Sequence, residues 1–278
     1  MSGRTLDIET RVELNNDVMM PILGLGVYLA GKGRGTENAV LSALEAGYRL
    51  IDTASMYGNE PEVGRAIKMS GIPREEIFVT TKLWNDDHGY DRTIKAAKES
   101  LSKLQMNYID LYLIHWPVYG KRLETWKAFE ALYEEGLFRA IGVSNYEIRH
   151  LEELLGSCQI KPAVNQVEFS PFTYRKELLE FSSKNGIVLE AYSPLARGAK
   201  FSNHVLLRIA RKHGKSPAQV MIRWILEKGV VAIPKSSNRE RIRENASVFD
   251  FSLDEEDTKL LDSLNEDYHV SWDPTGAP

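Results

Sequence analysis

Three ionisable side chains end three successive apolar segments of this sequence. Asp52 ends the first segment, Lys82 the second and His115 the third, and Tyr57 lies five positions beyond Asp52. Asp52 would keep Lys82 charged, and the ammonium of Lys82 would lower the pKa of Tyr57 from the ordinary phenol value of about 10. His115 could donate a hydrogen bond to a substrate oxygen. Together these groups can protonate an oxygen on which negative charge develops, as happens when hydride reduces a carbonyl.

Each of these residues also has a structural interpretation. Asp52 and Lys82 could form a buried ion pair, because an unpaired buried charge is costly, and a single histidine such as His115 is often a core residue. A lysine at a strand end is also typical of aldolases that form a Schiff base, but a carboxylate partner would keep the Lys82 amine protonated and argues against that chemistry. The occurrence of all three groups at the same end of three segments favours a catalytic site.

Composition limits the class of protein. The chain has 278 residues, of which 43% are hydrophobic and 27% charged, and its net charge is −4. These values are ordinary for a soluble globular protein, and the net charge argues against a nucleic-acid or acidic-membrane partner. We find no signal peptide and no apolar run near the roughly 20 residues that span a bilayer. With Cys158 as the single cysteine, we expect a protein of the reducing cytoplasm.

Short apolar segments alternate with amphipathic ones along most of the chain. A β-hairpin is expected at residues 12–22. Strands are expected at residues 23–28, 49–54, 77–83, 109–115, 138–144, 163–169, 187–193 and 230–234. Helices are expected at residues 37–46, 62–68, 92–104, 124–134, 148–155, 175–184 and 218–227, with two extra helices at residues 205–212 and 254–264.

Nearly continuous apolar strands are typical of parallel sheets covered on both faces. Eight of them with crossover helices predict an α/β fold, a closed (β/α)₈ TIM barrel with an N-terminal hairpin, in one domain covering residues 1–278. A doubly wound open sheet is the competing fold. In a barrel the functional site lies at the carboxyl ends of the strands. There the sequence places Ser144, Asn145, Gln166, Tyr192, Ser193, Lys235 and Ser236 in addition to the three ionisable groups.

Six motifs in this order resemble the signatures of the aldo-keto reductases. They are Asp52-Thr-Ala-x-x-Tyr57-x-Asn59-Glu60, Thr81-Lys82-Leu83-Trp84, Asp110-Leu-Tyr-Leu-Ile-His115-Trp116-Pro117, Gly142-Val-Ser-Asn145, Asn165-Gln166-Val-Glu168 and Ile233-Pro-Lys235-Ser236. The resemblance implies a monomeric barrel that reduces aldehydes and ketones with NADPH, with Asp52, Tyr57, Lys82 and His115 as a catalytic tetrad and Tyr57 as the proton donor.

The chain is most similar to the short-loop branch of that family, which contains 2,5-diketo-gluconate reductases and protozoan prostaglandin F synthases. Short loops imply an open pocket and broad specificity. Small aldehydes and α-dicarbonyls are the expected substrates, and keto-sugars or prostaglandin-type carbonyls are the alternatives. A binding protein that keeps the cofactor site without turnover is a further alternative, which the complete tetrad disfavours.

The charges near the last strand favour NADPH over NADH. Lys235 and Arg241 flank a helix start expected at Asn238, and cations there suit a 2′-phosphate. The segment Gly31-x-Gly33-x-Gly35 lacks the strand–helix context of a dinucleotide-binding fingerprint. The resemblance assigns Ser236 and Arg241 to the phosphate, Glu244 and Asn245 to the adenine, Ser144, Asn145 and Gln166 to the carboxamide, Tyr192 to stacking on the nicotinamide, and the backbone of Ser193 to Leu195 to the pyrophosphate. Gly26, Val27, Asp52 and Lys235 complete the predicted cofactor-binding residues.

The aromatic residues beside the strand ends predict the substrate pocket. Tyr28, Trp84, His115 and Trp116 should line it, and Trp272 in the tail could close it. Trp126 and Trp224 lie within helical patterns and are expected in the core. We interpret Asp86-Asp87-His88 as a solvated turn, and no metal site is predicted.

Overall fold

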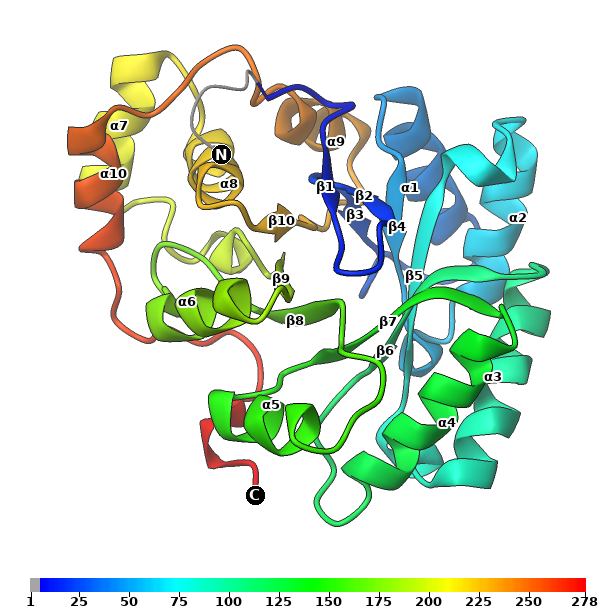
Figure 1. Ribbon diagram of the computed structural model, residues 1–278. Coiled ribbons are helices and arrows are strands. Elements are labelled where there is room, and N and C mark those ends of the chain that lie inside the picture. The colour runs from blue at the N-terminus through cyan, green and yellow to red at the C-terminus, as the bar shows by residue number, and fades with distance from the viewer. Residues whose placement is uncertain (1–5) are drawn as a thin grey trace.

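The computed structural model describes residues 6–278, and its centre is a closed ring of eight parallel strands (Figure 1). The strands are β3 (Leu25–Gly26), β4 (Leu50–Asp52), β5 (Phe78–Leu83), β6 (Ile109–Ile114), β7 (Phe138–Ser144), β8 (Val164–Glu168), β9 (Val188–Tyr192) and β10 (Val231–Ala232). Neighbours in sequence are neighbours in the sheet. Parallel bridges from Leu23 to Ala232 and from Gly26 to Lys235 join its two ends. The expected barrel is therefore confirmed, and the open sheet is not.

Helices surround this ring, as Figure 1 shows. Those that follow the barrel strands are α1 (Arg34–Glu45), α2 (Glu60–Ser70), α3 (Tyr90–Leu104), α4 (Arg122–Glu134), α5 (Ile148–Leu155), α6 (Lys176–Lys184), α8 (Pro217–Glu227) and α9 (Arg239–Ala246). The two extra helices, α7 (His204–His213) and α10 (Glu255–Asp262), pack against each other beside α8.

Local sequence explains several of the helix starts. The Ser216 hydroxyl accepts a hydrogen bond from the backbone N–H of Gln219, and Pro217 occupies the first turn of α8. The Asn238 side chain caps α9 in the same way by accepting from the N–H of Arg241. The expected helix start at Asn238 is confirmed, and it places the first turn of α9 beside the end of β10.

An N-terminal hairpin closes the amino-terminal end of the barrel. Its strands are β1 (Arg11–Glu13) and β2 (Met19–Pro21). Leu14 and Met20 are buried and belong to an apolar cluster with Leu50, Phe78 and Leu111 from the barrel strands. This inner cluster fills the barrel below the carboxyl ends of the strands, so the functional groups above it rest on a packed base.

Several expected elements are shorter than the sequence indicated, the first and last barrel strands among them. The first and last barrel strands contain two residues each, whereas residues 23–28 and 230–234 were expected. Pro234 has no N–H to extend the ladder of β10. The segment with Tyr57 forms a short 3₁₀ helix over Ser55–Tyr57.

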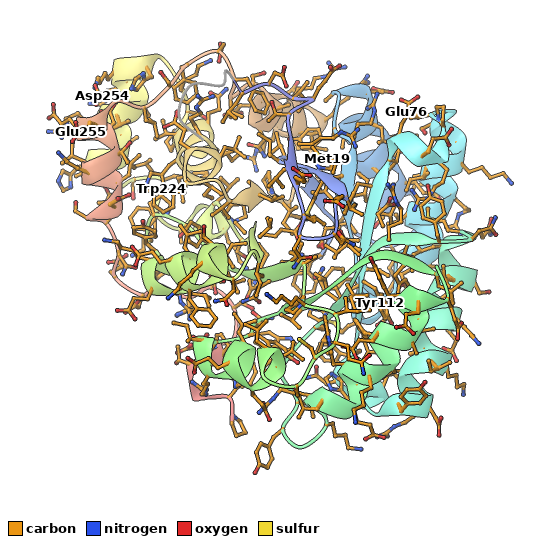
Figure 2. All side chains as sticks on the ribbon, viewed as in Figure 1. Met19, Glu76, Tyr112, Trp224, Asp254 and Glu255 are labelled. Atoms are coloured by element: carbon orange, nitrogen blue, oxygen red, sulfur yellow. The ribbon has the colours of Figure 1, made fainter. Side chains whose placement is uncertain are left out.

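The large side chains of the core match the sequence-based expectation. Trp126 and Trp224 are both buried. Figure 2 shows Tyr112 and Trp224 among the interior side chains, whereas Met19, Asp254 and Glu255 lie on the outside of the molecule.

A tightly packed glycine position inside the barrel gives a stability prediction. A Cβ atom at Gly142 on β7 would lie 2.5 Å from the Val164 carbonyl oxygen and 2.8 Å from Leu113 Cδ2. We expect Gly142→Ala to lower the free energy of unfolding by about 1–3 kcal/mol in urea denaturation, because overpacking must shift backbone. The control is Gly156→Ala, where φ is −72° and the nearest atom is 3.3 Å away. Equal midpoints for the two variants would contradict the prediction.

Candidate active site

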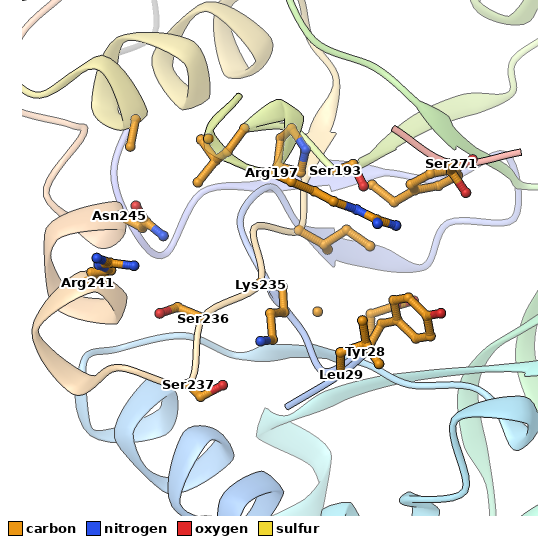
Figure 3. Close-up of a pocket in the computed structure, with 18 of the residues that line it drawn as sticks. Tyr28, Leu29, Ser193, Arg197, Lys235, Ser236, Ser237, Arg241, Asn245 and Ser271 are labelled. Atoms are coloured by element: carbon orange, nitrogen blue, oxygen red, sulfur yellow. The ribbon is translucent and has the colours of Figure 1, made fainter. Parts of the chain in front are cut away.

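A cavity of about 1080 Å³ opens at the carboxyl ends of the barrel strands (Figure 3). The predicted site residues that line it are Gly26, Tyr28, Asp52, Tyr57, His115, Trp116, Ser144, Asn145, Gln166, Tyr192, Ser193, Leu195, Lys235, Ser236, Arg241, Glu244 and Asn245. Val27, Lys82 and Trp84 were also predicted, but they are not among the lining residues. The cavity thus joins side chains from opposite ends of the sequence.

Lys82 and Asp52 form a buried ion pair at the cavity wall, which Asp52 lines and Lys82 does not. The Lys82 Nζ donates to Asp52 Oδ1 at 2.7 Å and to Oδ2 at 2.8 Å, and also to the carbonyl oxygen of Thr53 at 2.9 Å. Burial favours the neutral amine, but the negative charge of Asp52 and its hydrogen bonds with the amine outweigh that effect, so the pKa of Lys82 is raised. Burial raises the pKa of Asp52, and Lys82 opposes that rise. We infer a charged pair, because one Nζ bridges both carboxylate oxygens.

This arrangement disfavours Schiff-base chemistry at Lys82. The amine is fully buried and outside the cavity lining. Its protons are already donated to Asp52 and to the Thr53 carbonyl. A nucleophilic amine must be neutral and able to reach the substrate carbonyl, and Lys82 meets neither condition.

Tyr57 extends from its 3₁₀ helix over the ion pair. Its hydroxyl lies 3.4 Å from Lys82 Nζ. Burial raises the pKa of Tyr57 to about 12, although the charge of Lys82 acts to lower it. The expectation that Lys82 makes this phenol more acidic than an ordinary phenol is therefore wrong in net direction, because desolvation of the phenolate exceeds the attraction of the ammonium. The phenol is protonated throughout the neutral range.

His115 follows β6 and lies between two aromatic rings. Its ring centroid is 5.8 Å from that of Tyr57 and 5.2 Å from that of Trp84, both in edge-on arrangements. Burial, followed by the charge of Lys82, holds the pKa of His115 well below its ordinary value. The imidazole is therefore neutral at physiological pH and can donate only one N–H hydrogen bond.

The four residues that the resemblance assigned to the nicotinamide end lie on three neighbouring strands. The Tyr192 hydroxyl donates to Asn145 Oδ1 at 2.9 Å, and the Asn145 amide nitrogen donates to the His115 carbonyl oxygen at 3.0 Å. The Ser144 hydroxyl donates to the Gln166 carbonyl oxygen at 2.8 Å. These bonds fix the side chains relative to one another before any ligand is present.

Glu190 on β9 is a buried ionisable residue that the sequence analysis missed. Its side chain is fully buried, and Gln166 Nε2 donates to its Oε2 at 2.7 Å. Burial, together with the charge of Asp52, raises the pKa of Glu190 from its ordinary value of 4.5 to about 8. The one sequence signal was a glutamate two positions before Tyr192 in an otherwise apolar strand, which places both side chains on the same face.

The far end of the cavity contains cations and the start of α9. Lys235, Ser236, Arg241 and Asn245 surround it in Figure 3. Arg239, the neighbouring cation, is paired with Glu45 at 2.7 Å. Arg241 has no carboxylate partner among residues 6–278, so its charge remains available to an anion. The predicted basic pair thus lines one cavity with the tetrad residues Asp52, Tyr57 and His115.

The turn after β9 adds residues that the sequence analysis missed. Ser193, Ala196 and Arg197 have φ values of 47°, 45° and 51°, in the left-handed region. Leu195, at φ −101° and ψ 9°, precedes Ala196, whose backbone N–H donates to the Ser193 carbonyl oxygen at 2.9 Å and closes the turn. Arg197 also lines the cavity, as do Leu29, Met56, Phe201 and Ser271. An arginine following a strand end was the available sequence signal.

The predicted aromatic residues surround the mouth of the cavity. Tyr28 is 40% exposed, and its ring lies 4.9 Å from that of Tyr57. Trp116 contacts Trp272 with 4.7 Å between centroids, and Trp272 is 59% exposed. Trp84 contacts His115 without lining the cavity. The tail residue Trp272 therefore packs on the lining residue Trp116 but does not itself line the cavity.

Two further features of the described chain bear on its class. Within residues 6–278, no group of three or more His, Cys, Asp or Glu side chains is arranged to hold a metal ion. No helix in the same range is both long and apolar enough to cross a bilayer.

Comparison with known proteins agrees with the geometry. The model described as "Aldo/keto reductase family" matches residues 23–266. A 9,11-endoperoxide prostaglandin H2 reductase of Trypanosoma cruzi is 54% identical over 95% of this chain and 94% of its own. A glyoxal reductase of Bacillus subtilis is 51% identical over 96% and 97%.

Solved structures give the same result. An aldo-keto reductase from a Medee basin deep-sea metagenome library has a TM-score of 0.92 at 50% identity, covering 96% of this chain and 99% of its own. A Bombyx mori aldo-keto reductase in complex with NADP has a TM-score of 0.89 at 36% identity, covering 96% and 95%. The resemblance drawn from the sequence motifs is confirmed.

The raised pKa of Glu190 predicts a pH dependence of stability. In the unfolded chain this carboxyl ionises near 4.5, whereas in the folded protein it stays neutral up to about 8. Stability from Glu190 is therefore complete below about pH 4.5 and is lost as pH rises through 8. We expect Glu190→Gln to gain thermal stability over the wild type at pH 8 but not at pH 4.5. The control is the exposed Glu134→Gln. The same difference in thermal stability between Glu190→Gln and the wild type at both pH values would contradict the raised pKa of Glu190.

Proposed function

Because this chain belongs to the aldo/keto reductase family, we propose that it reduces aldehydes and ketones to alcohols with NADPH. One domain covering residues 1–278 carries the whole reaction. The observation that carries this proposal is the position of Tyr57, whose hydroxyl is 3.4 Å from a buried ammonium and which lines the large cavity.

The residues around the cavity fit an NADPH molecule. Arg241 and Lys235 provide positive charge for a 2′-phosphate. Ser193 and Leu195 in the turn after β9 line the cavity, and their backbone would contact the pyrophosphate. At the other end, Gln166 and Tyr192 line the cavity and would hold the nicotinamide. When bound, NADPH supplies the hydride. A solved relative from Bombyx mori contains NADP, which supports the same choice of cofactor.

Tyr57 donates the proton to the carbonyl oxygen. An alkoxide that forms on that oxygen is a stronger base than phenolate, so proton transfer from the phenol is favourable even with a pKa of about 12. The phenolate that remains lies beside the Lys82 ammonium, which stabilises it. The high pKa keeps the proton on Tyr57 until the substrate oxygen becomes basic.

His115 and Asp52 support that transfer. A neutral imidazole can donate one hydrogen bond to the substrate oxygen without adding a charge. Asp52 holds Lys82 in place through both carboxylate oxygens, which fixes the ammonium close to the Tyr57 oxygen. Tyr57 and His115 therefore act directly on one substrate oxygen at the cavity wall, and Asp52 acts on it through Lys82.

Small aldehydes and α-dicarbonyls are the proposed substrates. The glyoxal reductase of Bacillus subtilis is 51% identical, and glyoxal is an α-dicarbonyl. The exposed Tyr28, Leu29 and Trp272 leave the mouth open, so larger carbonyls such as keto-sugars or prostaglandin-type compounds can also be accepted.

Removing the phenolic oxygen tests the proton donor. We expect Tyr57→Phe to lower kcat for glyoxal reduction by about 10²–10⁴-fold, the usual contribution of a positioned general acid, while the Kd for NADPH changes little. The control is Tyr119→Phe, which removes a hydroxyl from a residue that is 71% exposed. NADPH oxidation and fluorescence titration provide the two readouts. Full activity in the Tyr57 variant would overturn the proton-donor assignment.

Removing the guanidinium of Arg241 tests the cofactor choice. We expect Arg241→Ala to weaken NADPH binding by about tenfold, because a charge-assisted contact to a phosphate is lost, and to leave NADH binding unchanged. Arg243→Ala removes an exposed cation from the same helix outside the cavity lining and provides the matched control. Equal losses for both dinucleotides would exclude a 2′-phosphate contact.

A further inference from the structure

Glu190 lies one layer below the cavity, at the boundary between polar and apolar parts of the barrel interior. It shares the inward face of β9 with Val188 and Tyr192, both of which pack against the inner apolar cluster. Glu190 is buried and is not a lining residue. Its partner in the sheet register is Gln166 on β8, which does line the cavity. Gln166 is therefore the cavity residue through which a hydrogen bond to Glu190 can act on a ligand.

The amide of Gln166 is held between two carboxyl groups. Its Nε2 donates to Asp52 Oδ2 at 2.8 Å and to Glu190 Oε2 at 2.7 Å. An amide nitrogen has two hydrogens, so both are used inside the protein. A flipped amide would place its own oxygen against carboxyl oxygens of Asp52 and Glu190, which cannot both donate to it. The remaining polar atom, Gln166 Oε1, is left as an acceptor on the cavity side.

We propose that Glu190 is a positioning residue for the nicotinamide end of the cofactor and acts through Gln166. By accepting the second amide hydrogen, Glu190 fixes the orientation in which Gln166 presents an oxygen to the N–H₂ of the cofactor carboxamide. If Asp52 were the only acceptor, one hydrogen of the Gln166 amide would have no partner, and the amide group could rotate about the last bond of its side chain. The inference rests on the proposed use of NADPH and names a residue that touches neither cofactor nor substrate.

The surroundings of Glu190 agree with a role in orientation rather than in charge balance. The charges that face it are Asp52 on β4 and Lys82 on β5, and these two are already paired with each other at 2.7 Å. Its second oxygen, Oε1, is buried with no hydrogen-bond partner among residues 6–278. A buried carboxyl group with one unsatisfied oxygen is costly, and an apolar side chain would fit the inner cluster below it without that cost.

The test compares ligands that include and lack the nicotinamide. NADPH contains the carboxamide, whereas adenosine 2′,5′-bisphosphate occupies only the adenine end. We expect Glu190→Leu to raise the Kd for NADPH about tenfold and to leave the Kd for the bisphosphate unchanged. Glu190→Gln, which keeps an acceptor oxygen, should restore NADPH binding to within about twofold of the wild type. Circular dichroism checks that each variant is folded, and Glu190→Met repeats the test if the leucine variant is not.

Two controls show whether the effect is specific to the Glu190–Gln166 contact. Glu60→Gln changes another buried carboxyl, which accepts from Thr81 on the outer face of the barrel, and should leave both Kd values unchanged. In a Gln166→Ala background, Glu190→Leu should have no further effect on NADPH binding.

Either of two results would overturn the proposal. One is wild-type NADPH affinity in the Glu190→Leu variant, and the other is an equal loss for both ligands. If the wild-type protein bound no NADPH, the proposed function would fail together with this inference. If it bound and oxidised NADPH normally, a negative result would remove the Glu190 inference alone.

Discussion

The Lys82–Asp52 ion pair is the interaction on which the site depends. Both side chains are buried, and removing two charges from water costs more than their attraction usually returns. The pair therefore contributes little to the stability of the fold. Its role is to fix the position of the Lys82 ammonium. Neighbouring strands β4 and β5 bring the two residues together, so the barrel itself sets where the ammonium stands and hence where Tyr57 can be stabilised as phenolate.

Exclusion of water around the Lys82–Asp52 pair determines the protonation states of the neighbouring side chains. Burial raises the pKa of Tyr57 and of Glu190 and lowers that of His115. All three groups are therefore neutral near pH 7, and the charges of the inner site are confined to Asp52 and Lys82. In the proposed mechanism, such a phenol keeps its proton until the substrate oxygen becomes basic, whereas an unusually acidic phenol would already be ionised near neutral pH.

The sequence predicted most of the architecture because parallel strands and their helices alternate with a clear apolar pattern. Strand-end residues such as Asp52 and Gln166 were found because polarity changes abruptly there. Three features could not be predicted from the sequence. The net pKa shift of Tyr57 depends on how much water its surroundings exclude. Glu190 lies inside a strand, where one charge gives no sign of its partner. Arg197 reaches the cavity through left-handed backbone at a non-glycine residue, which local sequence does not signal.

The tail is attached to the barrel independently of the pocket it borders. The Glu168 carboxylate, on β8, accepts from the backbone N–H of Val270 at 2.7 Å and of Ser271 at 3.3 Å. Because these bonds use main-chain groups, the side chains at 271 and 272 can change without loosening the anchor. Substitutions at these two tail positions can therefore change substrate selectivity in related proteins while the residues at the strand ends stay in place. For the same reason, new tail segments can be designed onto this barrel.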